Sequence, residues 1–179
     1  MQWIELPSCL FAVRDGSSIE TWQDATLTLQ VIDKLNFGQV STPAWSAELR
    51  KVLSGLGWVI SKFEQEQCTF SDTGTLDQFM ETRLPGDQTV KQPLMKLLRG
   101  RIGAPQTPHF VGTIEEADTV PVLSGVVFLI ESSGSGGLPT CSSFSVTAHL
   151  NLSVFSLARP ALLKKLAPEK KPADQAAKQ

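Results

Sequence analysis

The sequence of 179 residues is poor in histidine and cysteine, two residue types that often carry catalysis or bind metals. It has two histidines, His109 and His149, and three cysteines, Cys9, Cys68 and Cys141. The cysteines follow no metal-ligand spacing, and one would be left over even if two were bridged. We therefore expect reduced, buried thiols. No motif specifies a reaction, so we expect no catalytic residue, no metal and no cofactor.

Charge and hydropathy exclude two further classes of function. The formal net charge of -2 argues against nucleic acid as a partner. No uninterrupted apolar run approaches the ~20 residues that a membrane-spanning helix needs. The N-terminal residues lack the basic and apolar regions of a cleavable signal peptide. We expect a cytoplasmic location, or export without a cleavable signal peptide.

The clearest pattern present is a strict alternation of apolar and polar residues over 144–154. Only a β-strand has this period, because successive side chains on a strand point to opposite faces. A second run, 120–130, is apolar on both alternating faces and is typical of a strand covered on both sides. The Gly/Ser-rich segment 131–143 leaves no room for a crossover helix, so we predict an antiparallel hairpin.

Helical spacing dominates the N-terminal two thirds of the chain. A capping box at Ser17 and Glu20 and an N-cap at Thr42 mark two helix starts. The predicted helices span about 18–36, 42–57, 75–84 and 89–102. Residues 58–63 fit either a last helical turn or a short strand, and 65–74 is a predicted loop. The predicted remainder comprises an edge strand within 3–13, a strand at 110–114 and a polar turn at 115–118.

These elements predict an α+β fold, with an N-terminal helical layer packed on a small antiparallel β-sheet formed mainly by the C-terminal third. We expect a single domain over residues 1–167. Its predicted parts are helical over 17–103, mainly β over 109–155 and a short helix over 157–167. The composition of residues 168–179 predicts a flexible tail.

Three short motifs resemble known sites without the surroundings that their chemistry needs. The acidic residues Glu115, Glu116 and Asp118 lack the spacing of an EF-hand. The Asp-Thr-Gly triplet at 72–74 occurs in aspartic proteases, but this chain is too short for two lobes, and only a homodimer could supply the second. The glycine-rich stretch 134–137 leads into a strand and not into a phosphate-binding helix. We interpret the acidic residues as a solvated turn, the Asp-Thr-Gly triplet as a chance match and the glycine-rich stretch as a mobile hairpin loop.

The polar face of the alternating strand is the candidate partner-binding surface, with Thr147, His149 and Asn151. The leading hypothesis is a non-enzymatic binding or assembly protein that acts through contacts with another protein or with itself. The alternative is a membrane-active, toxin-like protein that inserts the 120–154 hairpin into a bilayer. In that case the inserting residues would include Val126, Phe128, Leu150 and Leu152. An enzyme of unknown class, with His149 as its candidate base, is the third hypothesis.

Overall fold

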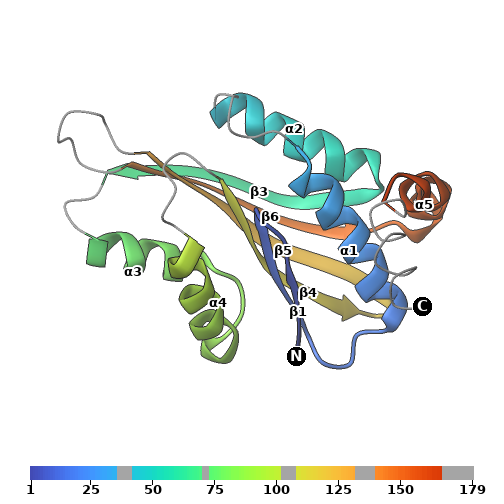
Figure 1. The fold of residues 1–179 in the computed structure, drawn as a ribbon, viewed down its shortest axis with the longest axis horizontal. Coiled ribbons are helices and arrows are strands. Elements are labelled where there is room, and N and C mark those ends of the chain that lie inside the picture. The colour runs from blue at the N-terminus through green and yellow to red at the C-terminus, as the bar shows by residue number, and fades with distance from the viewer. Residues whose placement is uncertain (36–41, 70–72, 102–107, 132–139, 167–179) are drawn as a thin grey trace, which may run out of the picture.

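The structure, a computed structural model, describes residues 1–35, 42–69, 73–101, 108–131 and 140–166 (Figure 1). The strands in these ranges are β1 (Gln2–Glu5), β2 (Cys9–Val13), β3 (Trp58–Thr69), β4 (His109–Ala117), β5 (Val120–Glu131) and β6 (Thr140–Leu150). The helices are α1 (Ile19–Asp33), α2 (Thr42–Gly55), α3 (Thr73–Arg83), α4 (Gln88–Arg101) and α5 (Leu152–Leu166). The predicted α+β class is confirmed.

The six strands form one sheet in the order β1-β2-β4-β5-β6-β3. All neighbours are antiparallel except β2 and β4, which run parallel with Cys9 opposite Phe110. The sheet is therefore mixed, and the prediction of a purely antiparallel sheet is wrong at this ladder. A long connection through the helices returns the chain to the same end of the sheet, which allows parallel pairing. The N-terminal strands β1, β2 and β3 also supply half of the sheet.

Helices cover both faces of the sheet, as Figure 1 shows. Helices α1, α2 and α5 lie on one face, here called the upper face, and α3 and α4 lie on the lower face. Strand β5 has apolar side chains on both faces and therefore needs cover on both. Leu123 and Val127 lie in the upper core, and Val126 and Phe128 lie in the lower core. The prediction that β5 is covered on both sides is confirmed. The predicted helical layer is instead divided between the two faces.

Two facing glycines make room for aromatic packing in the upper core. Gly112 of β4 lies opposite Gly125 of β5. A Cβ atom on Gly125 would lie 2.6 Å from Cε2 of Phe110, and one on Gly112 would lie 2.8 Å from Cε1 of Phe11. Phe11 and Phe110 form an edge-to-face pair with ring centroids 4.8 Å apart. A side chain at Gly125 would displace this pair, whereas one at Gly112 would first meet the backbone of β5 at the carbonyl oxygen of Ser124.

The alternating strand ends earlier than its sequence pattern predicts. Strand β6 stops at Leu150, and α5 begins at Leu152, five residues before the predicted helix at 157. The Asn151 carbonyl Oδ1 accepts hydrogen bonds from the backbone N–H groups of Ser153 and Val154. Such capping offers the backbone an alternative to the strand. The predicted strand is therefore wrong over residues 151–154.

Strand β3 differs most from the sequence prediction. Residues 58–63, left open between helix and strand, belong to a strand that continues to Thr69. The loop predicted from Gln65 is therefore wrong over residues 65–69. Most of β3 is exposed, and residues 64–67 are polar on both alternating faces. Because such an edge strand is exposed on both faces, its sequence lacks the alternation of apolar and polar residues by which a strand is recognised.

The polar turn predicted at 115–118 is displaced toward β5. Glu115 and Glu116 belong to β4, and the turn is made by Asp118 and Thr119. Both turn residues have positive φ angles, 52° and 66°. Aspartate tolerates this left-handed conformation better than most residues, which suits it to the first position of a tight hairpin.

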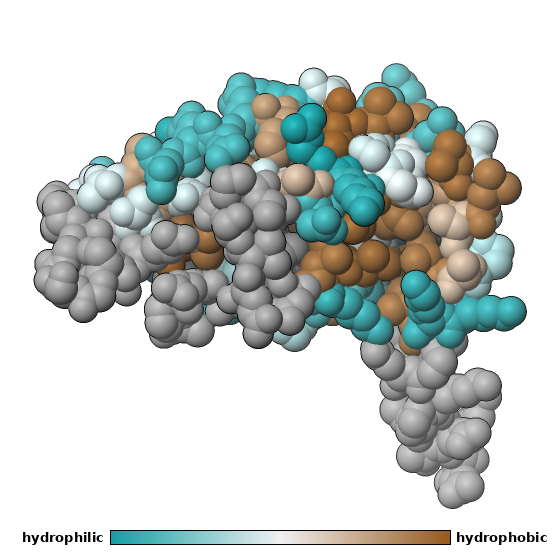
Figure 2. Space-filling view, turned by 90° about the horizontal axis from the view of Figure 1, so that it is seen from above, coloured by the Kyte–Doolittle hydropathy of each residue, from teal (hydrophilic) through white to brown (hydrophobic). Residues whose placement is uncertain are grey.

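The upper surface is uneven in polarity. Figure 2 shows hydrophilic residues over the α2 side of this surface and hydrophobic residues gathered toward α5. Leu157 and Leu163 of α5 are 82% and 50% exposed. Helix α5 thus buries Phe155 and Leu162 in the upper core while other apolar side chains face solvent.

Candidate interaction surface

Helices α3 and α4 cover only part of the lower face of the sheet (Figure 1). Beyond them, at the end where β3 begins and β6 ends, the lower face carries side chains that are exposed or half-buried. We call this region the open face, and it consists of Val59, Lys62, Val122, Ser124, Thr147 and His149. It is built from three neighbouring strands, β5, β6 and β3.

Two of the predicted partner-binding residues, Thr147 and His149, belong to the open face. Across the strands, His149 lies between Val122 and Val59, and Thr147 lies between Ser124 and Lys62. Directly opposite side chains in antiparallel strands have Cβ atoms about 4.5–5.5 Å apart, so each row forms a continuous surface. Val59 is 46% exposed. The open face therefore combines apolar contact area with hydroxyl, imidazole and ammonium groups.

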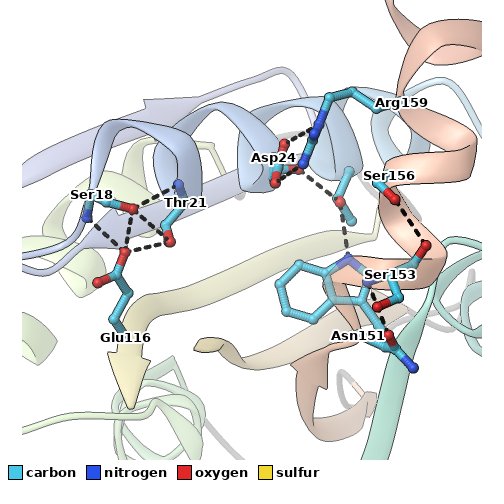
Figure 3. A network of polar contacts seen from close by, with 10 residues as sticks. Ser18, Thr21, Asp24, Glu116, Asn151, Ser153, Ser156 and Arg159 are labelled. Carbon is cyan, nitrogen blue, oxygen red and sulfur yellow. Dashed lines mark hydrogen bonds and ion pairs between the residues drawn. The ribbon is translucent and has the colours of Figure 1, made fainter. Parts of the chain in front are cut away.

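The third predicted residue, Asn151, is not part of the open face. It precedes α5, and its side chain caps that helix, as Figure 3 shows. Its backbone N–H donates to the carbonyl of Gly57, 2.8 Å away, and joins the start of α5 to the start of β3. The alternating sequence pattern predicts Asn151 on the same face as His149, but this holds only if β6 continues past Leu150, where it ends.

Strand β3 borders the open face and forms one edge of the sheet. It is twelve residues long and pairs only with β6 within the described ranges. Its register is irregular between Ile60 and Lys62 and then regular from Lys62 to Thr69. The other edge strand, β1, has four residues. The long edge of β3 therefore carries backbone N–H and C=O groups on its outer side that no described strand pairs with.

A carboxylate from β4 caps the first turn of α1 (Figure 3). Glu116 Oε1 accepts from the backbone N–H of Ser18 at 2.7 Å and from the hydroxyl of Thr21 at 2.5 Å. The Ser18 hydroxyl also donates to Oε1, and this hydrogen bond, followed by those from the Thr21 hydroxyl and the Ser18 backbone, lowers the pKa of Glu116. Ser18 Oγ in turn accepts from the N–H of Thr21, so Ser18 and not the predicted Ser17 is the N-cap. This acidic residue serves helix capping, as a carboxylate at a helix N-terminus ordinarily does.

The other two members of the acidic cluster have separate surroundings. Glu115 lies 4.0 Å from the guanidinium of Arg14, and Asp118 lies in the β4–β5 turn. Within the part of the chain that the structure describes, no group of three or more His, Cys, Asp or Glu side chains could hold a metal ion. The first residue of the Asp-Thr-Gly triplet, at position 72, lies outside the described residues. The glycine-rich stretch 134–137 also lies outside them.

His109 and Cys9 are buried rather than available to a substrate. His109 is 7% exposed, and within the described ranges neither ring nitrogen has a hydrogen-bond partner. Burial lowers the pKa of His109, and the nearby Arg101 lowers it further. Burial, together with Asp33, raises the pKa of Cys9 to about 12. A neutral imidazole and a protonated thiol are therefore the expected forms near neutral pH.

The residues of the membrane-insertion hypothesis lie mostly in the protein core. Val126, Phe128 and Leu150 are 0%, 1% and 2% exposed, and Leu152 belongs to α5 and is 44% exposed. The two long strands do form an antiparallel hairpin, with Val122 opposite His149. Among the described helices, none is long and apolar enough to cross a membrane.

Two features of this region were missed by the sequence interpretation. One is the long β3 edge, whose polar residues resemble a loop. The other is a pair of cysteines, because Cys68 of β3 lies directly opposite Cys141 of β6. No local signal relates these cysteines, since their proximity depends on the pairing of strands that are distant in the chain.

The chain matches no protein-family model, no curated protein and no solved structure.

Proposed function

We propose that this protein is a non-enzymatic binding or assembly protein that acts through protein–protein contacts at β3 and the adjoining open face. The observation that supports the proposal is the twelve-residue edge strand with an unpaired outer side among the described strands. A row of alternating N–H and C=O groups is satisfied in full by another extended backbone. The partner is therefore a protein that adds a strand to this edge.

The charge pattern of β3 favours a different protein over a second copy of this chain. Two copies would pair β3 with β3 in antiparallel orientation about a two-fold axis. Centring the pair on Glu64 or Glu66 places that residue opposite itself, and centring it on Gln65 places Glu64 opposite Glu66. Like charges directly opposite each other destabilise strand pairing. Centring it on Phe63 places Lys62 opposite Glu64, a favourable pair of charges, but sets the irregular Ser61 region against the regular part of the strand.

The open face would select among partner strands. Side chains on the lower side of an added strand would lie next to Lys62 and Glu64, which form an ion pair at 3.5 Å. Glu66 is held by Arg83, whose Nε donates to Oε2 at 2.8 Å. We expect basic or hydroxyl side chains opposite the two glutamates. Contacts with Val59 and His149 would add apolar area beyond the strand.

Membrane insertion has no comparable support. Val126, Phe128 and Leu150 would have to leave a packed core in which each is at most 2% exposed. Burial of such side chains stabilises the fold by about 1.5–3 kcal/mol each. An enzyme is likewise not proposed, because the open face brings together no nucleophile and base with an orienting group.

Site-specific photo-crosslinking in the cells that produce the protein tests the proposal. A benzophenone amino acid is placed at Gln65 or Gln67 of β3, which are exposed edge positions. Matched controls carry it at Gln78 of α3 and Ser156 of α5, which are also exposed. We expect one protein to be linked from both edge positions and from neither control.

The linked protein is then purified and mixed with the intact chain. Hydrogen exchange is expected to show slower exchange of β3 amides between Phe63 and Thr69, with α3 and α5 unchanged. Equal cross-linking from edge and control positions would overturn the proposal. A cross-linked dimer of this chain alone would overturn the choice of partner and make self-association the function of the edge.

A further inference from the structure

Cys68 and Cys141 occupy directly opposite positions in the antiparallel β3–β6 ladder. Both side chains therefore point to the same face of the sheet, here the lower face. Cys68 is half-buried, whereas Cys141 is fully buried. The adjacent pair Thr69 and Thr140 is the last in the ladder, so the two cysteines lie near one end of the sheet.

The spacing of this pair is close to that of a disulfide. Directly opposite residues in an antiparallel ladder have Cβ atoms about 4.5–5.5 Å apart. A disulfide requires a Cβ separation of roughly 3.5–4.5 Å. To form the disulfide, the Cβ atoms of Cys68 and Cys141 would therefore have to approach each other by about 1 Å. A position near the end of a ladder permits such a movement more readily than a central one.

The third cysteine is placed on the other side of the sheet. Cys9 of β2 belongs to the upper core, and its thiol lies 3.8 Å from the carbonyl oxygen of Leu29 in α1. Cys141 belongs to the lower core. The sheet thus separates Cys9 from the other two thiols and leaves a single pair that can react within one chain.

We propose that Cys68 and Cys141 form a redox site that closes to an intramolecular disulfide on reaction with a low-molecular-weight disulfide. The Cys68 thiolate attacks one sulfur of the small disulfide, which forms a mixed disulfide and releases one small thiol. The Cys141 thiolate then attacks the Cys68 sulfur and releases the second small thiol. Two electrons pass to the small disulfide, and the two protein thiol protons leave on the released thiols.

Burial assigns different roles to the two cysteines. Burial, and then the neighbouring Cys68, raise the pKa of Cys141 to about 12. Cys68 is the more accessible thiol and reacts first, while Cys141 closes the bond. Because the thiolate is the nucleophile, the closing step is expected to accelerate by about tenfold for each pH unit between 7 and 9.

The bond would fasten the edge strand to the body of the sheet. It would close a long loop of the chain, which restricts the unfolded state. We expect the oxidised protein to unfold at a temperature roughly 5–15 °C higher than the reduced protein. Cys68 lies within β3, but the disulfide joins side chains on the lower face, whereas strand addition uses the outer backbone edge of β3, so either proposal can fail without the other.

The test equilibrates the full chain in glutathione buffers of graded oxidised-to-reduced ratio. Free thiols are counted, and non-reduced peptides are mapped by mass spectrometry. We expect the count to fall from three to one, with Cys68 and Cys141 in one linked pair of peptides. The closing rate measured at pH 7, 8 and 9 is expected to rise at each step.

Two variants serve as controls. Cys9→Ala is expected to form the same linked peptides, because the pair is retained. Cys68→Ser changes a half-buried position and is expected to form no intramolecular disulfide while remaining folded. Three free thiols at every buffer ratio would overturn the proposal, as would a mixed disulfide at Cys68 that never closes. A disulfide that involves Cys9 would also overturn it.

Discussion

Asp24 and Arg159 form a bidentate ion pair that joins α1 to α5. Nε of Arg159 donates to Oδ1 of Asp24 at 3.0 Å, and a terminal nitrogen donates to Oδ2 at 2.7 Å (Figure 3). Asp24 is 3% exposed, so its charge has little access to water. Close by, Trp58 Nε1 donates to the hydroxyl of Thr28, which donates to the Asp24 carbonyl. Helix α5 is thus attached to α1 by polar contacts as well as by its buried face.

Arg159→Gln is expected to lower the free energy of unfolding by about 2–3 kcal/mol, because it leaves the Asp24 carboxylate buried without a counter-charge. The solvent exposure of Arg159 keeps this value below that of a fully buried pair. Urea unfolding measures the change. Arg99→Gln is the matched control, since Arg99 pairs with Asp77 at 3.1 Å on the surface. Its expected cost is below about 1 kcal/mol, and an equal cost for both variants would contradict the argument.

His109 is expected to make the protein sensitive to mild acid. Its pKa is lowered in the folded state by burial and by Arg101. Below the unfolded pKa of about 6.5, the unfolded chain therefore binds the proton more tightly, and the free energy of unfolding falls as the pH decreases. His109→Leu removes both this titration and two unpartnered ring nitrogens. We expect it to flatten the decrease in stability between pH 7 and pH 5.

Chemical unfolding at a series of pH values provides the measurement for His109. His149→Gln serves as its comparison, because it removes the other histidine and retains His109. This variant is expected to keep the contribution of His109 to the acid dependence. An unchanged pH profile in His109→Leu would show that the buried imidazole does not control stability.

The fold was predictable where burial produces a period in the sequence. The alternation from Phe144 to Leu150 located β6, and the doubly apolar run located β5 as a strand covered on both sides, although the division of the helices between the two faces was not predicted. The parallel contact of β2 with β4 was not predictable, because pairing between distant strands depends on the whole topology. The end of β6 was missed because Asn151 forms local capping bonds that the hydrophobic pattern does not reveal.

The candidate site was predictable only in its middle strand. Thr147 and His149 were found because they alternate with buried residues of β6. Their neighbours Val59 and Lys62 lie on an edge strand that is exposed on both faces and therefore has no period. The pairing of Cys68 with Cys141 follows from strand register, which one sequence does not specify for distant segments.

Gly57 is expected to tolerate no side chain at the junction of α2, β3 and α5. Its φ angle is 95°, and an added Cβ would lie 2.9 Å from Cβ of Val154. Gly57→Ala should therefore lower the free energy of unfolding by about 1–3 kcal/mol. Gly55→Ala is the matched control, because nothing lies within 4 Å of its added Cβ. Helix propensity predicts a gain of about 0.5–1 kcal/mol there. Thermal and urea unfolding distinguish the two, and equal effects would refute the steric argument.

Proline substitution tests whether the outer side of β3 is unpaired. Backbone N–H groups of successive strand residues point to opposite sides, so one of Glu64 and Gln65 directs its N–H toward β6 and the other toward solvent. Glu64→Pro and Gln65→Pro should therefore differ. One should cost about 1–3 kcal/mol through loss of a ladder hydrogen bond, and the other below about 1 kcal/mol. Glu64→Ala and Gln65→Ala measure the side-chain contributions. Urea unfolding of all four variants gives the comparison, and equal large losses for both prolines would mean that the outer edge of β3 is already engaged.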